Sequence, residues 1–395
     1  MRALFTCHPA FGHFLPLTPV AHAMAEAGHD VAFGTPVTFR PAVEAAGFRW
    51  VQAGVENDDP EMAPRRARLL ELRGAEQHRY FRTRIVGDLR PRRLVPDILA
   101  LAESWRPDLI VHDSAECGAT IAAELLGIPH ATLVVLATGM STCTSMLDKP
   151  LQSVRATFGL PPRSIQGMLD EYLALVPFPP SLTLVGAPTS PVTHHFRGLP
   201  PDDRTIDLPT RLDHIGRRPL VYVSLGTALS RVRASEIFSK LLAGLQDADV
   251  EVVATVGRDL DPASLGPQPE HIHLERYLPL GALLPRCSLV VFHGGSGTLS
   301  HTVAHGLPMV ILPLAADHPE NAARCAELGA SRTLDQDNLT PEYVREVVLD
   351  VLHTPSYRQA AQRLRDEFDA LPGVDHAVEL LERLARDRVP VVASR

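Results

Sequence analysis

The chain has 395 residues, of which 45% are hydrophobic and 21% charged, and its formal net charge at pH 7 is -8. This length exceeds what one hydrophobic core usually supports, so two domains are expected in an ordinary globular protein. The negative charge argues against a nucleic-acid or anionic-membrane partner, because clustered positive charge dominates binding to phosphates.

The first half of the chain alternates short β-rich runs with helical patterns, which indicates βα units and a parallel sheet. Strands are predicted at 2–7, 30–34, 108–112 and 128–135, and helices at 14–27 and 116–126. His8, Pro9 and Gly12 interrupt the apolar N-terminal stretch too early for a signal peptide, and no apolar run approaches the roughly 18 residues of a membrane span. We therefore expect a cytoplasmic protein without a transmembrane segment.

Basic residues are unevenly distributed. Ten arginines lie between Arg65 and Arg93 with few acids among them. A solvated helical face is the favoured interpretation, and a dedicated anion site is the alternative. The chain has two lysines, Lys149 and Lys240, so a lysine phosphate clamp or a Schiff base has little support. The five cysteines are widely separated and form no CxxC motif, which indicates neither a zinc site nor a disulfide framework.

The βα pattern restarts after a Pro- and Asp-rich stretch that is typical of a linker. Strands are predicted at 220–224, 250–256, 288–293 and 308–313, and helices at 235–246, 298–305, 319–328, 341–352, 355–370 and 374–387. The predicted fold is α/β, with two doubly wound, Rossmann-like domains facing each other across a cleft. We expect these domains at 1–205 and 219–373, a linker at 206–218, and a C-terminal helix and tail at 374–395. One option for that last helix is to cross back to the N-terminal domain.

A glycine-rich loop follows the predicted strand at 288–293 and leads into a helix. Its sequence, GGSGT at 294–298, lets backbone N–H groups and the positive helix end approach a ligand, which favours a phosphate. A tight βα turn is the plain alternative. The loop lacks both the GxxxxGK[ST] and the GxGxxG patterns. His293, Ser296 and Thr298 would then supply the polar groups in place of lysine.

Several motifs around this loop resemble the nucleotide-sugar signature of GT-B glycosyltransferases. They are Tyr277-Leu278-Pro279-Leu280, HGGSGT at 293–298, His305-Gly306-Leu307-Pro308, and Asp317-His318 followed by Asn321. The resemblance is strongest to the family 1-like bacterial enzymes that glycosylate antibiotics, such as enediyne and macrolide glycosyltransferases. It extends to the segments 221–227 and 12–16, so it covers nearly the whole chain.

The resemblance implies a nucleotide-sugar site in which Tyr277 stacks on the pyrimidine base, although a core tyrosine is the alternative. The backbone of Leu278 would read the base edge, and Asp317 would accept hydrogen bonds from sugar hydroxyls. The diphosphate would be held by His293, Ser296, Gly297, Thr298 and Thr227. The complete implied set is Gly12, Ser224, Gly226, Thr227, Tyr277, Leu278, His293, Gly295, Ser296, Gly297, Thr298, Asp317 and His318.

Two positions depart from the family pattern. His318 stands where many members have Gln, so the sugar is not expected to be presented in the same way. His301 stands where plant relatives have a Glu that binds the ribose hydroxyls. This mildly favours a dTDP-sugar donor over a UDP-sugar.

The candidate base is His13, which follows a strand and lies at a helix start, where the imidazolium is disfavoured. A plain helix-start role is the alternative, but the resemblance makes this histidine the general base and Asp113 its partner. Asp108 and Glu116 are the competing acids; Asp108 should lie at the wrong edge of the sheet. The implied reaction is a one-step displacement with inversion that needs no metal or cofactor. The one DxD sequence, at 247–249, is expected to be an exposed turn.

We expect the acceptor pocket in the first domain, in loops around 55–95 and 136–175, and an apolar aglycone as the acceptor. Its candidate lining residues, each with core packing as the alternative, are Met140, Met146, Phe158, Met168 and Phe178. The predicted function is therefore a natural-product glycosyltransferase. The alternatives are a sugar-nucleotide epimerase and a non-catalytic nucleotide-binding module. The sequence leaves the oligomeric state open, with a homodimer as one option.

Overall fold

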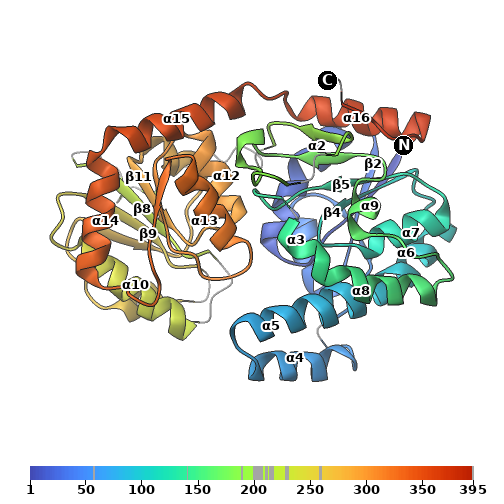
Figure 1. Ribbon diagram of the computed structural model, residues 1–395, viewed down its shortest axis with the longest axis horizontal. Helices are drawn as coiled ribbons and strands as arrows, with labels where there is room; N and C mark the ends of the chain where they lie inside the picture. The colour runs from blue at the N-terminus through green and yellow to red at the C-terminus, as the bar shows by residue number, and fades with distance from the viewer. Residues whose placement is uncertain are drawn as a thin grey trace. The chain divides into compact units, whose positions relative to one another are not determined.

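The computed structural model describes residues 1–56, 58–139, 141–187, 190–198, 208–209, 212, 218–226, 231–257 and 260–393. The chain divides into two compact units (Figure 1). Unit 1 consists of Met1–Phe178, Val185–Pro200 and Pro372–Arg395, and unit 2 of Pro179–Leu184 and Pro201–Leu371. Most of the predicted linker, 206–218, lies outside the described residues.

Unit 1 contains a parallel sheet of seven strands in the order β3-β2-β1-β4-β5-β6-β7. The strands are β1 Arg2–Thr6, β2 Asp30–Thr35, β3 Arg49–Gln52, β4 Leu109–Asp113, β5 His130–Leu133, β6 Ala174–Val176 and β7 Thr193–His195. The α-helices are α1 Phe11–Phe14, α2 Thr18–Glu26, α3 Arg40–Ala45, α4 Met62–Glu71, α5 Gly74–Tyr80, α6 Arg90–Ser104, α7 Gly118–Leu126, α8 Ser141–Thr157, α9 Ile165–Leu169 and α16 Val374–Asp387. A π-helical segment, Phe81–Leu89, connects α5 to α6.

The central strands of this sheet are buried on both faces, which explains their continuous apolar sequences. Along β1, Ala3 and Phe5 belong to one core cluster, whereas Leu4 belongs to another on the opposite face. Apolar residues of α16 complete the first cluster, and this helix packs against α2 (Figure 1). The C-terminal helix is therefore part of unit 1.

Unit 2 contains a parallel sheet of six strands in the order β10-β9-β8-β11-β12-β13. The strands are β8 Leu220–Ser224, β9 Glu251–Thr255, β10 Ile272–Glu275, β11 Leu289–Phe292, β12 Met309–Ile311 and β13 Ser331–Thr333. The α-helices are α10 Arg231–Leu245, α11 Leu280–Leu283, α12 Ser296–Ala304, α13 His318–Glu327, α14 Pro341–His353 and α15 Pro355–Asp369. Two parallel-sheet Rossmann-like units confirm the predicted fold class.

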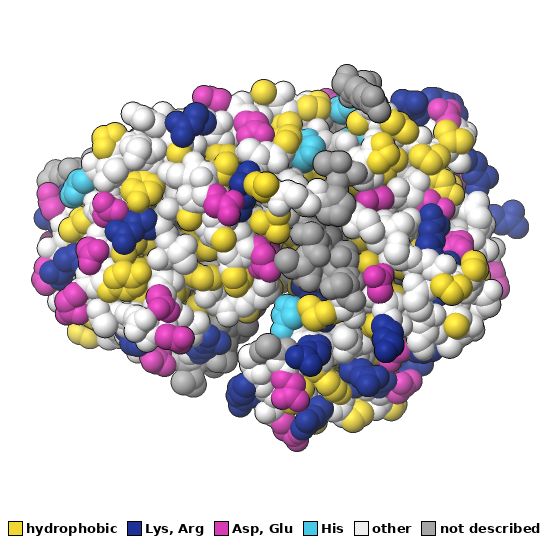
Figure 2. Space-filling model, viewed as in Figure 1, with side chains coloured by type: hydrophobic (Ala, Val, Ile, Leu, Met, Phe, Trp, Pro, Cys, Tyr) yellow, Lys and Arg dark blue, Asp and Glu magenta, His cyan; other side chains and the backbone are white. Residues whose placement is uncertain are grey.

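The arginine-rich segment is only partly a solvated face. Figure 2 shows Lys and Arg side chains gathered over α4 and α5, where Arg68 pairs with Glu71 at 2.8 Å. Arg82, in contrast, is buried in the π-helical segment. Arg90, at the start of α6, turns inward to contact the side chain of His8. The expectation of a uniformly solvated face is therefore wrong for these two arginines.

Candidate active site

The predicted base and its partner meet at the carboxyl ends of β1 and β4, where parallel sheets commonly place their sites. His13 lies in α1, which continues through a 3-10 turn at Leu15–Leu17 into α2. Its Nδ1 is 3.2 Å from Oδ2 of Asp113, the last residue of β4. The carboxylate is fully buried, whereas the imidazole side chain keeps 23% of its surface exposed. Gly12, which precedes the base, also belongs to unit 1.

Backbone N–H groups hold the carboxylate of Asp113 in place. His8 N donates to its Oδ2 at 2.7 Å, and Ala115 N donates to its Oδ1. The competing acid Asp108 precedes β4 and accepts from the backbone of Arg2 at 2.8 Å, at the opposite end of β1 from His13. The strand polarity therefore separates the two aspartates as expected.

Three further ionisable groups surround this pair. Burial raises the pKa of Glu116 to about 7, against the opposing effect of the Arg90 charge. Burial lowers the pKa of Arg90, which the carboxylates of Glu116 and Asp113 partly restore. Burial raises the pKa of Cys7 well above its usual value, so this thiol stays protonated. A small cavity beside them is lined by Thr6, Cys7, Pro9, Pro36, Ala53, Gly54, Val55, Arg90, Leu94 and Glu116.

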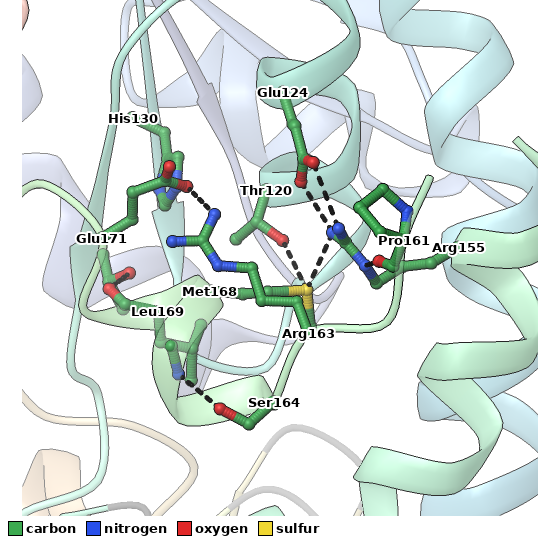
Figure 3. Close-up of polar contacts among 12 residues, drawn as sticks. Thr120, Glu124, His130, Arg155, Pro161, Arg163, Ser164, Met168, Leu169 and Glu171 are labelled. Atoms are coloured by element: carbon green, nitrogen blue, oxygen red, sulfur yellow. Dashed lines mark hydrogen bonds and ion pairs between the residues drawn. The ribbon is translucent and has the colours of Figure 1, made fainter. Parts of the chain in front are cut away.

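A second polar network anchors the α8–α9 region against α7 and β5 (Figure 3). The guanidinium of Arg155 binds both carboxylate oxygens of Glu124, at 2.7 and 3.1 Å, and also contacts the sulfur of Met168 at 3.4 Å. Glu171 joins the guanidinium of Arg163 at 2.7 Å to the ring of His130 at 3.4 Å. These contacts tie the end of α8 and the α9 segment to α7 and β5 within unit 1.

The structure separates the predicted lining residues of the acceptor pocket. Met168 and Phe178 are buried core residues, so core packing is correct for both. Phe158 packs against the core cluster around α6 and α7. Met146 is partly exposed on α8, and Met140 lies outside the described residues.

The glycine-rich loop of unit 2 follows β11 and ends at the N-terminus of α12. Gly294 has φ 92°, a conformation that favours glycine, so the tight-turn alternative accounts for this position. Gly297 is different, because a Cβ there would meet no atom within 4 Å. Gly295 is the N-cap residue of α12, and it makes no side-chain capping hydrogen bond to the first turn of the helix.

His293 lies against the backbone of this loop. A Cβ at Gly226, whose φ is 70°, would fall 2.6 Å from His293 Nε2, and Gly295 allows no more room on its side. Burial lowers the pKa of His293 to about 4, against the opposing effect of a hydrogen bond with the backbone of Ser224. The ring is therefore neutral at pH 7. Thr227, predicted to hold the diphosphate, lies outside the described residues.

Ser296, Asp317 and Asn321 form a compact polar group behind the loop. Ser296 Oγ donates to Asp317 Oδ2 at 2.6 Å, and Asn321 Nδ2 reaches the same oxygen at 2.8 Å. Asn321 also donates to the carbonyl of Gly294 at 2.8 Å and is fully buried. The hydroxyl of Ser296 is therefore engaged on both sides, as a donor to Asp317 and as an acceptor from Asn321 Nδ2 at 3.1 Å.

The remaining predicted residues line the same end of unit 2. Tyr277 precedes α11 and is 68% exposed, so the core-tyrosine alternative is wrong, whereas Leu278 is buried. Ser224 ends β8, and its hydroxyl accepts from Thr255 at 3.2 Å. Half-buried Thr298 lies in the first turn of α12, next to exposed Gly297.

Two histidines carry the departures from the family pattern. His318 begins α13, and its Nδ1 accepts from Ala315 N at 3.1 Å, so that any ring proton lies on Nε2. Burial lowers its pKa, against the charges of Asp317 and Glu320. Burial also lowers the pKa of His301, in α12, to about 4. Both rings are therefore neutral at pH 7.

The described residues contain neither a metal-binding cluster nor a membrane-spanning helix. Within the described ranges, no three His, Cys, Asp or Glu side chains are grouped so that they could hold a metal ion. Asp247 and Asp249 of the DxD sequence lie between α10 and β9, with side chains 76% and 93% exposed. No helix in the described part of the chain is long and apolar enough to cross a membrane.

Three residues that take part in these sites were not assigned a role from the sequence. His8 and Arg90 carry no motif, and their proximity to Asp113 depends on tertiary packing. Asn321 stood in the recognised motif, but its role as an internal hydrogen-bond donor depends on the fold of the loop.

Comparison with known proteins gives a consistent result across both units. Models of the erythromycin biosynthesis protein CIII-like N-terminal and C-terminal domains match residues 22–195 and 239–384. The 4'-demethylrebeccamycin synthase of Lentzea aerocolonigenes is 30% identical, covering 97% of this chain and 99% of its own length. The 10-deoxymethynolide desosaminyltransferase of Streptomyces venezuelae is 29% identical, covering 98% of this chain and 97% of its own.

A solved structure agrees with these relatives. The crystal structure of the glycosyltransferase VinC in complex with dTDP is 25% identical, with a TM-score of 0.78, and the match covers 98% of this chain and 100% of that one. The chain therefore belongs to the erythromycin biosynthesis protein CIII-like family and is a glycosyltransferase of the GT-B fold.

Proposed function

We propose that this enzyme transfers a sugar or deoxysugar, with inversion and without a metal ion, from a dTDP-sugar in preference to a UDP-sugar. The acceptor is a hydroxyl of an apolar natural-product aglycone. The observation that carries the proposal is the buried pairing of His13 Nδ1 with Asp113 Oδ2 at 3.2 Å. The named activities of the relatives, among them a desosaminyltransferase, support the substrate class.

The chemistry of the base follows from that pairing. In the proposed mechanism, Nδ1 of His13 carries the proton and faces the carboxylate of Asp113 at 3.2 Å, which places the lone pair of the neutral ring on Nε2. Nε2 takes the proton of the acceptor hydroxyl as its oxygen bonds to the anomeric carbon. The bond from that carbon to the diphosphate oxygen breaks, and its electron pair leaves with the nucleoside diphosphate. Asp113 stabilises the imidazolium until the proton passes to solvent.

The donor site meets the opposite need, because negative charge grows on the leaving diphosphate. The first-turn N–H groups of α12 and the positive end of its dipole favour that charge. Gly297 leaves open space beside these groups, and exposed Tyr277 offers an aromatic face for the base. Neither contribution requires a bound cation.

Two measurements test this function. A thermal-shift series with dTDP, UDP, GDP and ADP in EDTA should show stabilisation by dTDP, then UDP, of roughly 2.7 kcal/mol at 100 times the dissociation constant. His13→Ala should then abolish transfer to an aglycone panel while it retains the dTDP shift. Conversion of a dTDP-sugar without any acceptor would indicate an epimerase, and retained transfer by His13→Ala would exclude His13 as the base.

A further inference from the structure

His8 lies in the connection between β1 and α1, five positions before the candidate base, and its backbone bonds to Asp113 and to the N-cap residue of the helix that carries the base. Its N–H donates to Asp113 Oδ2 at 2.7 Å, the same oxygen that lies 3.2 Å from His13 Nδ1. Its carbonyl accepts from Ala10 N at 2.7 Å, and Ala10 is the N-cap of α1. The main chain of His8 therefore fixes the carboxylate and the start of the helix that carries the base.

The side chain of His8 packs directly on the base. The centroids of the His8 and His13 rings are 4.7 Å apart, and the ring planes meet at 85°. Phe81 lies 6.4 Å from the His8 ring at 63°. Edge-to-face packing of this kind is a preferred aromatic geometry, and it opposes rotation of the His13 ring away from Asp113.

Arg90 determines the protonation of His8. Its guanidinium contacts His8 Nδ1 from the first turn of α6, and its Cζ lies 6.0 Å from the ring of Phe81. A guanidinium only donates hydrogen bonds, so Nδ1 of His8 accepts, and the ring is neutral with its proton on Nε2. The nearby carboxylates of Glu116 and Asp113 offset the charge of Arg90.

This geometry also removes His8 as a competing base. One ring nitrogen is engaged by Arg90, and the other already carries the proton. His8 therefore has no lone pair to offer to an acceptor hydroxyl.

We propose that His8 is a positioning residue for His13, and that Arg90 holds its imidazole in the Nε2–H tautomer against the ring of the base. This inference rests on the proposed function for its effect on the rate, but the ring geometry is measurable without turnover. Its backbone bond to Asp113 remains in any side-chain variant, so substitutions isolate the contribution of the ring.

Two matched variants separate the ring from the acceptor nitrogen. His8→Phe keeps an aromatic ring against His13 but cannot accept from Arg90. His8→Asn keeps an acceptor near the position of Nδ1 but has no ring. We expect His8→Asn to lower kcat about tenfold or more, with KM for the donor unchanged, because a base that rotates freely is misplaced for attack. His8→Phe should stay within about threefold of the unchanged enzyme.

The histidine nitrogens give an independent readout in the intact protein by 15N NMR, with assignments from His8→Asn and His13→Ala. Nδ1 of His8 should give an unprotonated resonance at pH 7, and Arg90→Met should abolish this fixed tautomer. The His13 Nδ1–H resonance should persist in His8→Phe and broaden in His8→Asn. An Nδ1–H tautomer of His8, or an Asn variant with unchanged kcat and an unchanged His13 resonance, overturns the inference.

A failure of the proposed function looks different. In that case the unchanged protein transfers no sugar, while the nitrogen resonances still decide whether His8 positions His13. Thermal unfolding of each variant checks that the variant is folded. A variant that has lost its folded state is left out of the comparison of kcat values.

Discussion

The two site regions handle charge in opposite ways. In unit 1, the base lies among ionisable groups, with buried Asp113 at 3.2 Å from His13 and the Arg90 guanidinium nearby. In unit 2, the histidines near the loop are neutral, since burial lowers the pKa values of His293 and His301 to about 4, and the carboxylate of Asp317 lies behind the loop against Ser296. Each arrangement suits the charge that the proposed reaction creates there: an imidazolium beside a carboxylate, and a diphosphate at uncharged N–H donors.

The largest expected effect comes from removing the charge that supports the base. Asp113→Asn keeps the size of the side chain but cannot stabilise the imidazolium, so we expect kcat to fall about 10³-fold or more. The dTDP thermal shift should stay unchanged. Asp108→Asn is the matched control, because Asp108 accepts from Arg2 at the other end of the sheet and should keep full activity. Equal losses in both variants would show a general effect on β4 instead.

Glu116 tests whether the charges of unit 1 cost stability. Its pKa is raised by burial to about 7 from an ordinary 4.5, so the folded protein binds the proton more tightly than the unfolded chain. The contribution of Glu116 to the free energy of unfolding is therefore fully present below pH 4.5. It is lost as the pH rises through 7. Glu116→Gln mimics the protonated form, and at pH 8 it should raise the free energy of unfolding by roughly 3 kcal/mol.

The measurement for Glu116 is the difference in thermal stability between the two proteins across pH 4 to 8. The difference should be near zero at pH 4 and grow toward pH 8. The neutral histidines of unit 2 have the opposite dependence, because their depressed pKa values make stability fall as the pH drops from 6.5 to 4. They contribute equally to both proteins and cancel in the difference. A difference that is flat with pH would contradict the buried ionisation of Glu116.

The glycines of unit 2 should separate structural from ligand-binding roles. Gly226→Ala places a Cβ 2.6 Å from His293 Nε2 at a φ of 70°, so both the melting temperature and dTDP affinity should fall. Gly297→Ala meets no atom within 4 Å, so stability should be kept while dTDP binds about tenfold more weakly. Titration calorimetry and thermal unfolding of both variants test this. Unchanged affinity in Gly297→Ala would place the diphosphate elsewhere.

The sequence predicted the central strands of both sheets better than the edges. β1, β4, β8 and β11 are buried on both faces, so each is a continuous apolar run that is visible without a structure. The edge strands β3, β7, β10 and β13 were missed, because THH in β7 and SRT in β13 have no such pattern. The interior strand β6 was missed as well, because its three buried residues are too short a run to stand out. Edge strands form where a neighbour offers hydrogen bonds, which local sequence does not encode.

The residues of the candidate site divide in the same way, into those that sequence motifs indicate and those that meet only in the folded structure. The glycine loop and the base belong to contiguous motifs, so their residues were predictable from the sequence. His8 and Arg90 are 82 positions apart, and they meet because the π-helical segment and α6 pack over the end of β1. The charge pattern from Arg65 to Arg93 indicated solvent exposure, but burial beside carboxylates determines the environment of Arg90. Such pairings require tertiary structure.

The smallest expected effect concerns the nucleoside preference. His301 is neutral at pH 7, because burial lowers its pKa to about 4, so it offers no anionic acceptor to a ribose 2'-hydroxyl. We expect dTDP to bind about threefold to tenfold more tightly than UDP, a difference of up to about 1.4 kcal/mol. His301→Glu would supply a carboxylate acceptor and should move the preference toward UDP, because a hydroxyl donates strongly to an ionised group.

His301→Gln is the control, since it adds no charge and should leave the preference near its original value. Competition titrations of both nucleotides against the three proteins measure the ratio directly. A ratio that the Glu and Gln variants change equally would attribute the preference to the shape of the site and not to the missing carboxylate.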